Sequence, residues 1–205
     1  MKLYSADRAP SPRRARIVMA EKGINLDEIE VINLDLGGGD NLKPEFRQKN
    51  PMTRVPLLEL DDGTCLAEGA AIARYFEETI PEPPLLGRNA LEKARVAMWS
   101  QRMEINLFLH VGMAFRNISG FFKDRETPVP EWGELCRQEV VSMIDFLDRH
   151  LGDNEYIVGD YYSFADITAL IAIDFAAVIK ARIEDRHQNL ARWHETVSSR
   201  PAASA

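Results

Sequence analysis

The chain has 205 residues, of which 45% are hydrophobic, enough for one large domain or two small ones with a sizeable core. Its formal net charge is −7, so we expect no broad affinity for nucleic acid or for an anionic membrane surface. No apolar run is long enough to span a bilayer, and the N-terminus lacks a signal segment. Two distant cysteines, Cys65 and Cys136, favour a reduced, cytoplasmic compartment, and the scattered histidines predict no metal site.

The first 80 residues alternate between strand and helix patterns. Ser11-Pro12 predicts the start of a helix that Gly23 ends, and Asp61-Asp62-Gly63 is the strongest hairpin signal in the chain. Alternating apolar residues predict the strands. The expected strands are 2–5, 30–33, 55–60 and 64–67, and the expected helices are 11–22, 44–49 and 68–79. The predicted order is β-α-β-α-β-β-α.

From residue 81 the pattern changes. Ile80-Pro81-Glu82-Pro83-Pro84 predicts a stiff linker, which we place at residues 81–89. Everything beyond it reads as helix, and residues 164–180 are so apolar that the helix there must be covered on all sides. The expected helices are 91–118, 131–151, 164–180 and 190–199. The sequence therefore predicts a small α/β domain, residues 1–80, and an all-helical domain, residues 90–205.

A Val-Pro dipeptide leads directly into one expected strand. Because proline has no N–H, Val55-Pro56 should lie at a strand edge or at a first strand position, and a cis bond is one solution. The N–H and C=O of Val55 would then be free to pair with an extended peptide by strand addition. Glu68-Gly69 follows at the head of an apolar helical pattern, where the carboxylate could hold the ammonium group of that peptide.

Three motifs, in this order and spacing, are similar to those of the cytosolic glutathione transferases, and the resemblance covers both domains. The chain looks most like the bacterial, zeta-like or fungal-like branches. The motifs are the loop Asn50–Pro56, the glutamate-bearing helix Glu68–Phe76 and the folding motif Gly159–Ile167. The resemblance implies a thioredoxin-like domain followed by a helical bundle, and a cytoplasmic detoxification enzyme. It also implies a homodimer, with glutathione as co-substrate and no metal.

The resemblance assigns the glutathione site to the first domain. Val55 and Pro56 would clamp the backbone of the peptide, and Glu68 would hold its ammonium group. Arg54 and Lys43 are candidates for the glycyl carboxylate, the alternative being ordinary solvated side chains. In the family a serine usually follows the glutamate and donates to the γ-glutamyl carboxylate.

Gly69 takes the place of that serine in this chain. The Gly69 N–H can still donate at a helix N-terminus, but a hydroxyl hydrogen bond to a charged group, typically about 1.5–3 kcal/mol, is missing. We therefore expect weaker glutathione binding or a changed ligand.

The thiol of glutathione must be deprotonated to act as a nucleophile. Ser11 is the catalytic residue implied by the resemblance, because a hydroxyl beside a helix N-terminus favours a thiolate. The alternative is that Ser11 merely caps the helix. Tyr4 and Ser5 are the other candidates in this region. Several classes carry the catalytic serine at positions that Ala9 and Pro10 fill here.

A stripe of larger side chains follows the expected helix 91–118, and core packing is its default interpretation. It comprises Trp99, Met103, Asn106, His110 and Asn117. The electrophile pocket is assigned to His110, Asn117 and Phe115. If Ser11 does not activate the thiol, the candidates are His110, Arg116 and Asn117, because some relatives use polar groups of this helix, sometimes through water.

The expected function is activation of glutathione for attack on a small hydrophobic electrophile. The reaction could be conjugation, peroxide reduction, isomerisation or dehalogenation. The alternative is a non-catalytic binding or stress-response protein on the same fold. In the second domain, Ser163-Phe164-Ala165-Asp166 predicts a capping box with a folding role.

Overall fold

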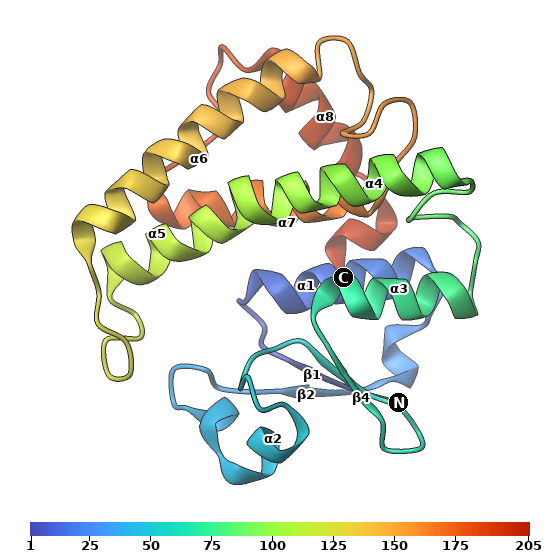
Figure 1. Ribbon diagram of the computed structural model, residues 1–205, viewed down its shortest axis with the longest axis vertical. Helices are drawn as coiled ribbons and strands as arrows, with labels where there is room; N and C mark the ends of the chain where they lie inside the picture. Colours follow the sequence, from blue (N-terminus) through green and yellow to red (C-terminus); the bar gives the residue numbers. More distant parts are fainter. The chain divides into compact units, whose positions relative to one another are not determined.

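The computed structural model describes residues 1–205, and the chain divides into two compact units (Figure 1). One unit comprises Met1–Pro84 with the terminal residues Ser204–Ala205, and the other comprises Leu85–Ala203. The division therefore falls directly after the proline-rich segment.

The first unit is built on a mixed four-stranded sheet in the order β2-β1-β3-β4. Its strands are β1 (Lys2–Ser5), β2 (Glu30–Asn33), β3 (Leu57–Glu59) and β4 (Cys65–Ala67). β1 pairs parallel with β2 and antiparallel with β3, which in turn pairs antiparallel with β4. Leu3 lies opposite Leu58 in this register, and both side chains are fully buried. The sheet is the thioredoxin-like arrangement expected from the sequence.

Three helices accompany the sheet: α1 (Pro10–Glu21), α2 (Pro44–Lys49) and α3 (Gly69–Thr79). α1 and α3 pack against each other and bury Ile17, Val18, Ile72 and Phe76. Two single-turn 3₁₀ helices, Leu26–Glu28 and Asp40–Leu42, were not expected, because one turn is too short to leave a periodic pattern.

The start of α1 corrects the prediction that Ser11 opens or caps this helix. The helix begins one residue earlier, with Ala9 as the N-cap and Pro10 as the first helical residue. Proline favours this position because its fixed φ suits a helix and its missing N–H costs nothing there. Ser11 is therefore inside the first turn. The C-terminal end agrees with the prediction, since Gly23 follows with a left-handed φ of 73°.

A buried lysine ties the end of α1 to the proline-rich segment. The Nζ atom of Lys22 lies 2.6 Å from the Glu77 carboxylate in α3, and it also donates to the carbonyls of Pro81 and Pro83, at 3.3 and 2.6 Å. The Lys22 side chain has no exposed surface. A charge so placed is tolerated because an opposite charge and two carbonyl oxygens surround it.

The second unit is entirely helical, as expected. Its main helices are α4 (Ala90–Met103), α5 (Leu109–Ser119), α6 (Pro130–His150), α7 (Phe164–Ala176) and α8 (Gln188–Ser198). Every residue of α7 from Phe164 to Ile173 is buried, which confirms that this apolar helix is covered on all sides. No helix is long and apolar enough to cross a membrane.

The helix expected over residues 91–118 is interrupted. α4 and α5 are joined without a break by a π-helical segment, Glu104–Phe108. A π-helical turn widens the helix by one residue and shifts the faces of the following residues, which a simple periodic pattern does not reveal. Accordingly, Trp99 and Met103 are buried as core residues, whereas Asn106 on the same supposed stripe is exposed.

The capping box at the start of α7 is confirmed. The Asp166 carboxylate, fully buried, accepts from the backbone N–H and hydroxyl of Ser163, at 2.9 and 3.0 Å. It also accepts from the Ile157 N–H at 2.8 Å and from the indole N–H of Trp193 in α8 at 2.9 Å. One carboxylate thus connects a loop and two helices of this unit.

Candidate glutathione site

The loop before β3 presents unpaired backbone groups. The Val55-Pro56 bond is cis, as the sequence suggested, and β3 begins only at Leu57. Neither the N–H nor the C=O of Val55 makes a hydrogen bond within the chain. Val55 therefore offers one donor and one acceptor next to a strand, which is the pattern required for pairing with an extended peptide.

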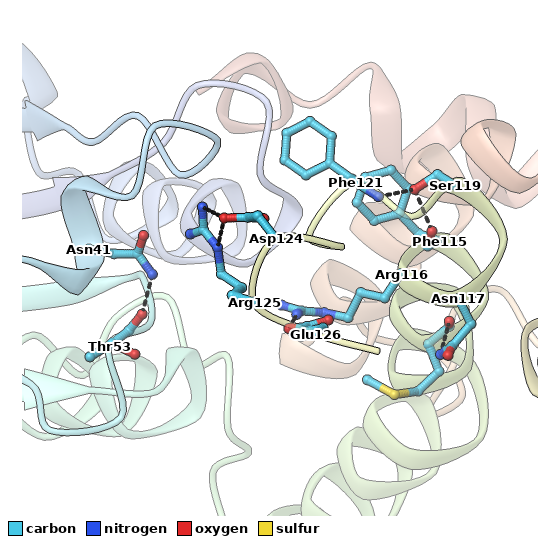
Figure 2. A network of polar contacts seen from close by, with 11 residues as sticks. Asn41, Thr53, Phe115, Arg116, Asn117, Ser119, Phe121, Asp124, Arg125 and Glu126 are labelled. Atoms are coloured by element: carbon cyan, nitrogen blue, oxygen red, sulfur yellow. Dashed lines mark hydrogen bonds and ion pairs between the residues drawn. The ribbon is translucent and has the colours of Figure 1, made fainter. Parts of the chain in front are cut away.

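Two asparagines hold this loop in place. The buried Asn50 side chain donates to the Arg54 carbonyl at 2.7 Å and accepts from the Met52 N–H at 3.1 Å. Asn41 donates to the Thr53 carbonyl at 2.6 Å (Figure 2). Thr53 itself has a φ of 54°, a conformation that a non-glycine residue adopts only when its surroundings impose it. The loop is thus fixed before any ligand arrives.

Glu68 and Gly69 form the second part of the candidate site. Glu68 is the N-cap of α3 rather than its first residue, and its φ of 70° with ψ of 124° is unusual for a side chain other than glycine. Such strain concentrates at ligand-binding positions. The Glu68 carboxylate is exposed, does not cap the helix, and makes no ion pair in the chain, so it is available for a cationic group.

The two basic candidates for the glycyl carboxylate differ. The Arg54 side chain is exposed and unpaired, because the contact of this residue with Asn50 uses its backbone carbonyl. The ammonium group of Lys43 instead lies 2.6 Å from Asp40, which raises the pKa of the lysine through a hydrogen bond and charge attraction. An anion would have to compete with Asp40 for Lys43, so Arg54 is the better placed of the two.

The candidates for thiol activation in this unit are separated by their hydrogen bonds. Tyr4 donates to Glu59 at 2.8 Å, and burial followed by that bond raises the pKa of its phenol, which opposes the formation of a phenolate. Ser5 is fully buried and accepts from Arg16 at 2.8 Å. The half-buried Ser11 makes no hydrogen bond with its hydroxyl, and it lies in the first turn of α1.

The candidates in the helical unit also differ in their contacts (Figure 2). Arg116 is paired with Glu126 and stacks on Phe122, with 4.6 Å between the guanidinium carbon and the ring centre. Asn117 accepts from the Val129 N–H at 2.8 Å and donates to the Met113 carbonyl at 2.9 Å. Both side chains therefore organise the segment between α5 and α6.

Phe115 and His110 are the other two candidates in the helical unit. Phe115 belongs to an aromatic cluster, with ring centres 5.6 Å from Phe121 and 5.3 Å from Phe175. His110 is the second residue of α5, directly after the π-helical segment, and its Nδ1 atom is buried without a hydrogen-bond partner. A buried ring nitrogen without a partner is costly unless water or a ligand completes it.

Sequence reasoning missed the roles of two residues that shape the first unit, Asn41 and Asn50. It does single out Arg14, with Arg13 and Arg16, as a basic cluster at the first helix that would favour an anion such as glutathione, with a solvated face as the alternative interpretation. Asn50 belongs to the loop motif, yet its side-chain role appears only in the hydrogen bonds. Arg14 is 4% exposed and lies directly beside Gly69, where an added Cβ would approach its Nε atom to 2.7 Å. No group of three or more His, Cys, Asp or Glu side chains is arranged to hold a metal ion.

Comparison with known proteins identifies the family of this chain. Residues 9–79 match the family model for the glutathione S-transferase N-terminal domain, and residues 99–201 match that for the C-terminal domain. Glutathione S-transferase 2 of Saccharomyces cerevisiae is 34% identical over 98% of this chain and 87% of its own length.

Solved structures are similar over nearly the whole chain. A Gtt2-class glutathione S-transferase of Vibrio parahaemolyticus is 40% identical, with a TM-score of 0.85 over 98% of this chain and 95% of its own. A glutathione S-transferase domain-containing protein of Marinobacter aquaeolei is 37% identical, with a TM-score of 0.93 over 98% and 99%. Gtt2 of Saccharomyces cerevisiae is 32% identical, with a TM-score of 0.91 over 100% of this chain and 99% of its own. The chain therefore belongs to the cytosolic glutathione S-transferase family and is similar to its yeast and bacterial Gtt2 members.

Proposed function

We propose that this enzyme binds glutathione along the free backbone edge at Val55 and deprotonates its thiol for attack on a small hydrophobic electrophile. The observation that carries the proposal is the fixed Val55-Pro56 loop, whose donor and acceptor have no partner in the chain. Strand-like pairing would hold the cysteinyl backbone of the peptide. Glu68 supplies a charge for the ammonium group, and Arg54 supplies one for the glycyl carboxylate.

In this proposal Ser11 stabilises the thiolate. Its hydroxyl is uncommitted and lies in the first turn of α1, where the helix dipole also favours an anion. A hydrogen bond to a charged group is worth about 1.5–3 kcal/mol, which corresponds to a thiol pKa lower by about one to two units. His110 is the competing candidate, because its Nδ1 atom lacks a partner in the chain.

The test compares Ser11→Ala and His110→Ala with the wild-type protein. The thiol pKa of bound glutathione is measured from the pH dependence of thiolate absorbance, and kcat/KM is measured with a generic aromatic halide. If Ser11 activates the thiol, Ser11→Ala raises the bound thiol pKa and lowers kcat/KM, while His110→Ala leaves the pKa unchanged. The reverse pattern assigns the role to His110.

Glutathione-agarose tests the binding step separately. Wild-type protein that is neither retained on this resin nor able to turn over the halide would contradict the proposed activity. Retention without turnover of any electrophile class would instead favour a binding protein. The assignment of the electrophile to a pocket near His110, Phe115 and Asn117 is tested by the same variants through the KM for the halide.

A further inference from the structure

The glycine at position 69, which lacks a hydroxyl, lies directly against the side chain of Arg14. Gly69 is the first residue of α3 and is buried. A Cβ built on it would lie 2.7 Å from Nε, 3.0 Å from Nη2 and 3.2 Å from Cζ of Arg14. Any side chain at position 69 would therefore collide with the Arg14 guanidinium unless one of the two moved.

Arg14 comes from the middle of α1 and has only 4% of its surface exposed. Its guanidinium therefore lies in a fixed position against the backbone that begins α3. A positive charge withdrawn from solvent acts on neighbouring charges with less screening than a surface charge. The N-terminal end of α3 is itself favourable to anions, because its first N–H groups have no partners within the helix.

From this juxtaposition we infer that Arg14 and Gly69 together form the recognition element for the γ-glutamyl carboxylate, with the buried guanidinium in place of the missing hydroxyl. The inference rests on the proposed glutathione site. Glu68 binds the ammonium group, while the Gly69 N–H and the charge of Arg14 favour the carboxylate on the same carbon. Gly69 is then required by Arg14 and is not a weakened serine position.

The inference makes Arg14 specific for one group of the ligand, so the test removes that group. Calorimetric titration measures the Kd of glutathione and of 4-aminobutanoyl-cysteinyl-glycine, which lacks only the γ-glutamyl carboxylate. We expect Arg14→Met to weaken glutathione binding by about tenfold, while binding of the decarboxylated peptide is nearly unchanged. Arg14→Lys keeps the charge and should keep most of the preference for glutathione.

Arg74→Met is the matched control. It removes one positive charge from α3, but Arg74 is exposed and paired with Glu78, four residues further along the same helix. We expect its Kd values for both peptides to match those of the wild type. Melting temperatures of all variants show whether a loss of binding reflects loss of folding.

Exchange at position 69 supplies a second, independent readout. Gly69→Ser alone should weaken glutathione binding, because its Cβ displaces the guanidinium. Combining Gly69→Ser with Arg14→Ala removes the collision and provides a hydroxyl, so the double variant should bind glutathione more tightly than Gly69→Ser alone. A single Gly69→Ser variant that binds as well as wild type would overturn the inference.

The remaining outcomes separate this inference from the proposed function. Wild-type protein that binds glutathione, with Arg14→Met losing equal affinity for both peptides, overturns the role of Arg14 and leaves the proposed function intact. Wild-type protein that binds neither peptide overturns both. Should Arg14→Met not fold, Arg14→Lys and the position 69 variants decide the question by the same comparison of the two peptides.

Discussion

Replacement of Asp166 should destabilise the helical unit, because this side chain accepts four buried hydrogen bonds there. The Asp166 carboxylate accepts four hydrogen bonds, from Ser163, Ile157 and Trp193, at 2.8–3.0 Å. Asp166→Ala leaves these buried donors without an acceptor, at about 1–3 kcal/mol each before relaxation. Because water can enter and satisfy some of these donors, we expect the free energy of unfolding to fall by about 3–5 kcal/mol. A folded domain typically has a free energy of unfolding of only about 5–15 kcal/mol. Soluble yield should fall with it.

The contribution of Asp166 to stability should also depend on pH. Burial raises the pKa of Asp166 from its ordinary 3.8 to about 6, against the four hydrogen bonds, which lower it. The folded state therefore binds the proton more tightly than the unfolded state between these values. The contribution to stability is fully present below pH 3.8 and is lost as the pH rises through about 6. The full difference corresponds to about 3 kcal/mol.

Asp166→Asn is the matched variant, because it keeps the shape of the side chain but does not titrate. Urea unfolding followed by tryptophan fluorescence is a suitable assay, since all three tryptophans, Trp99, Trp132 and Trp193, lie in the helical unit. The wild-type advantage over Asp166→Asn should shrink as the pH rises from about 4 to 7. An advantage that stays constant over this range would refute the reasoning, as would an Asp166→Ala variant as stable as wild type.

Three further predictions concern other polar contacts. Lys22→Met should lower the free energy of unfolding by about 3–5 kcal/mol in urea, because it removes the lysine charge that lies beside the buried Glu77 carboxylate. The double variant Lys22→Met/Glu77→Leu should recover part of that loss, and strictly additive effects of the two changes would exclude the coupling. Asn50→Ala should raise the KM for glutathione about tenfold with kcat less affected, because the binding loop loses two hydrogen bonds; an unchanged KM would exclude this role. Asn117→Ala should speed proteolytic cleavage between α5 and α6, because Val129 loses its acceptor, and an unaltered cleavage rate would count against it.

Most of the fold could be predicted because its signals are local. Alternation of apolar residues identified β1 and β2 at their observed bounds, and the run of apolar residues in α7 required burial on all sides. Ser163 and Asp166 are three residues apart, so their capping box was visible in the sequence. The π-helical segment was missed, because a one-residue widening leaves the surrounding helical pattern almost intact.

In the candidate site, too, the features with local sequence signals could be predicted and those that depend on distant residues could not. The sequence by itself determined the unpaired Val55-Pro56 edge and the acid at the start of α3, because proline chemistry and helix-start signals act within a few residues. It misplaced Ser11 by one helical position and left Tyr4, Ser5 and Ser11 open as alternatives. Their hydroxyls were distinguished only when Glu59 and Arg16, distant in sequence, were found bonded to the first two.

Tertiary structure alone decided the meaning of Gly69. In the sequence it was a missing hydroxyl, and the basic cluster Arg13, Arg14 and Arg16 gave only a general attraction for an anion with no link to position 69. Arg14 lies 55 positions earlier in the chain and reaches Gly69 only because α1 and α3 pack side by side. Steric exclusion and electrostatics depend on distance in space, whereas sequence patterns record distance along the chain. For that reason the sequence determined the fold and the outline of the peptide site, and the packing of two helices decided which groups complete it.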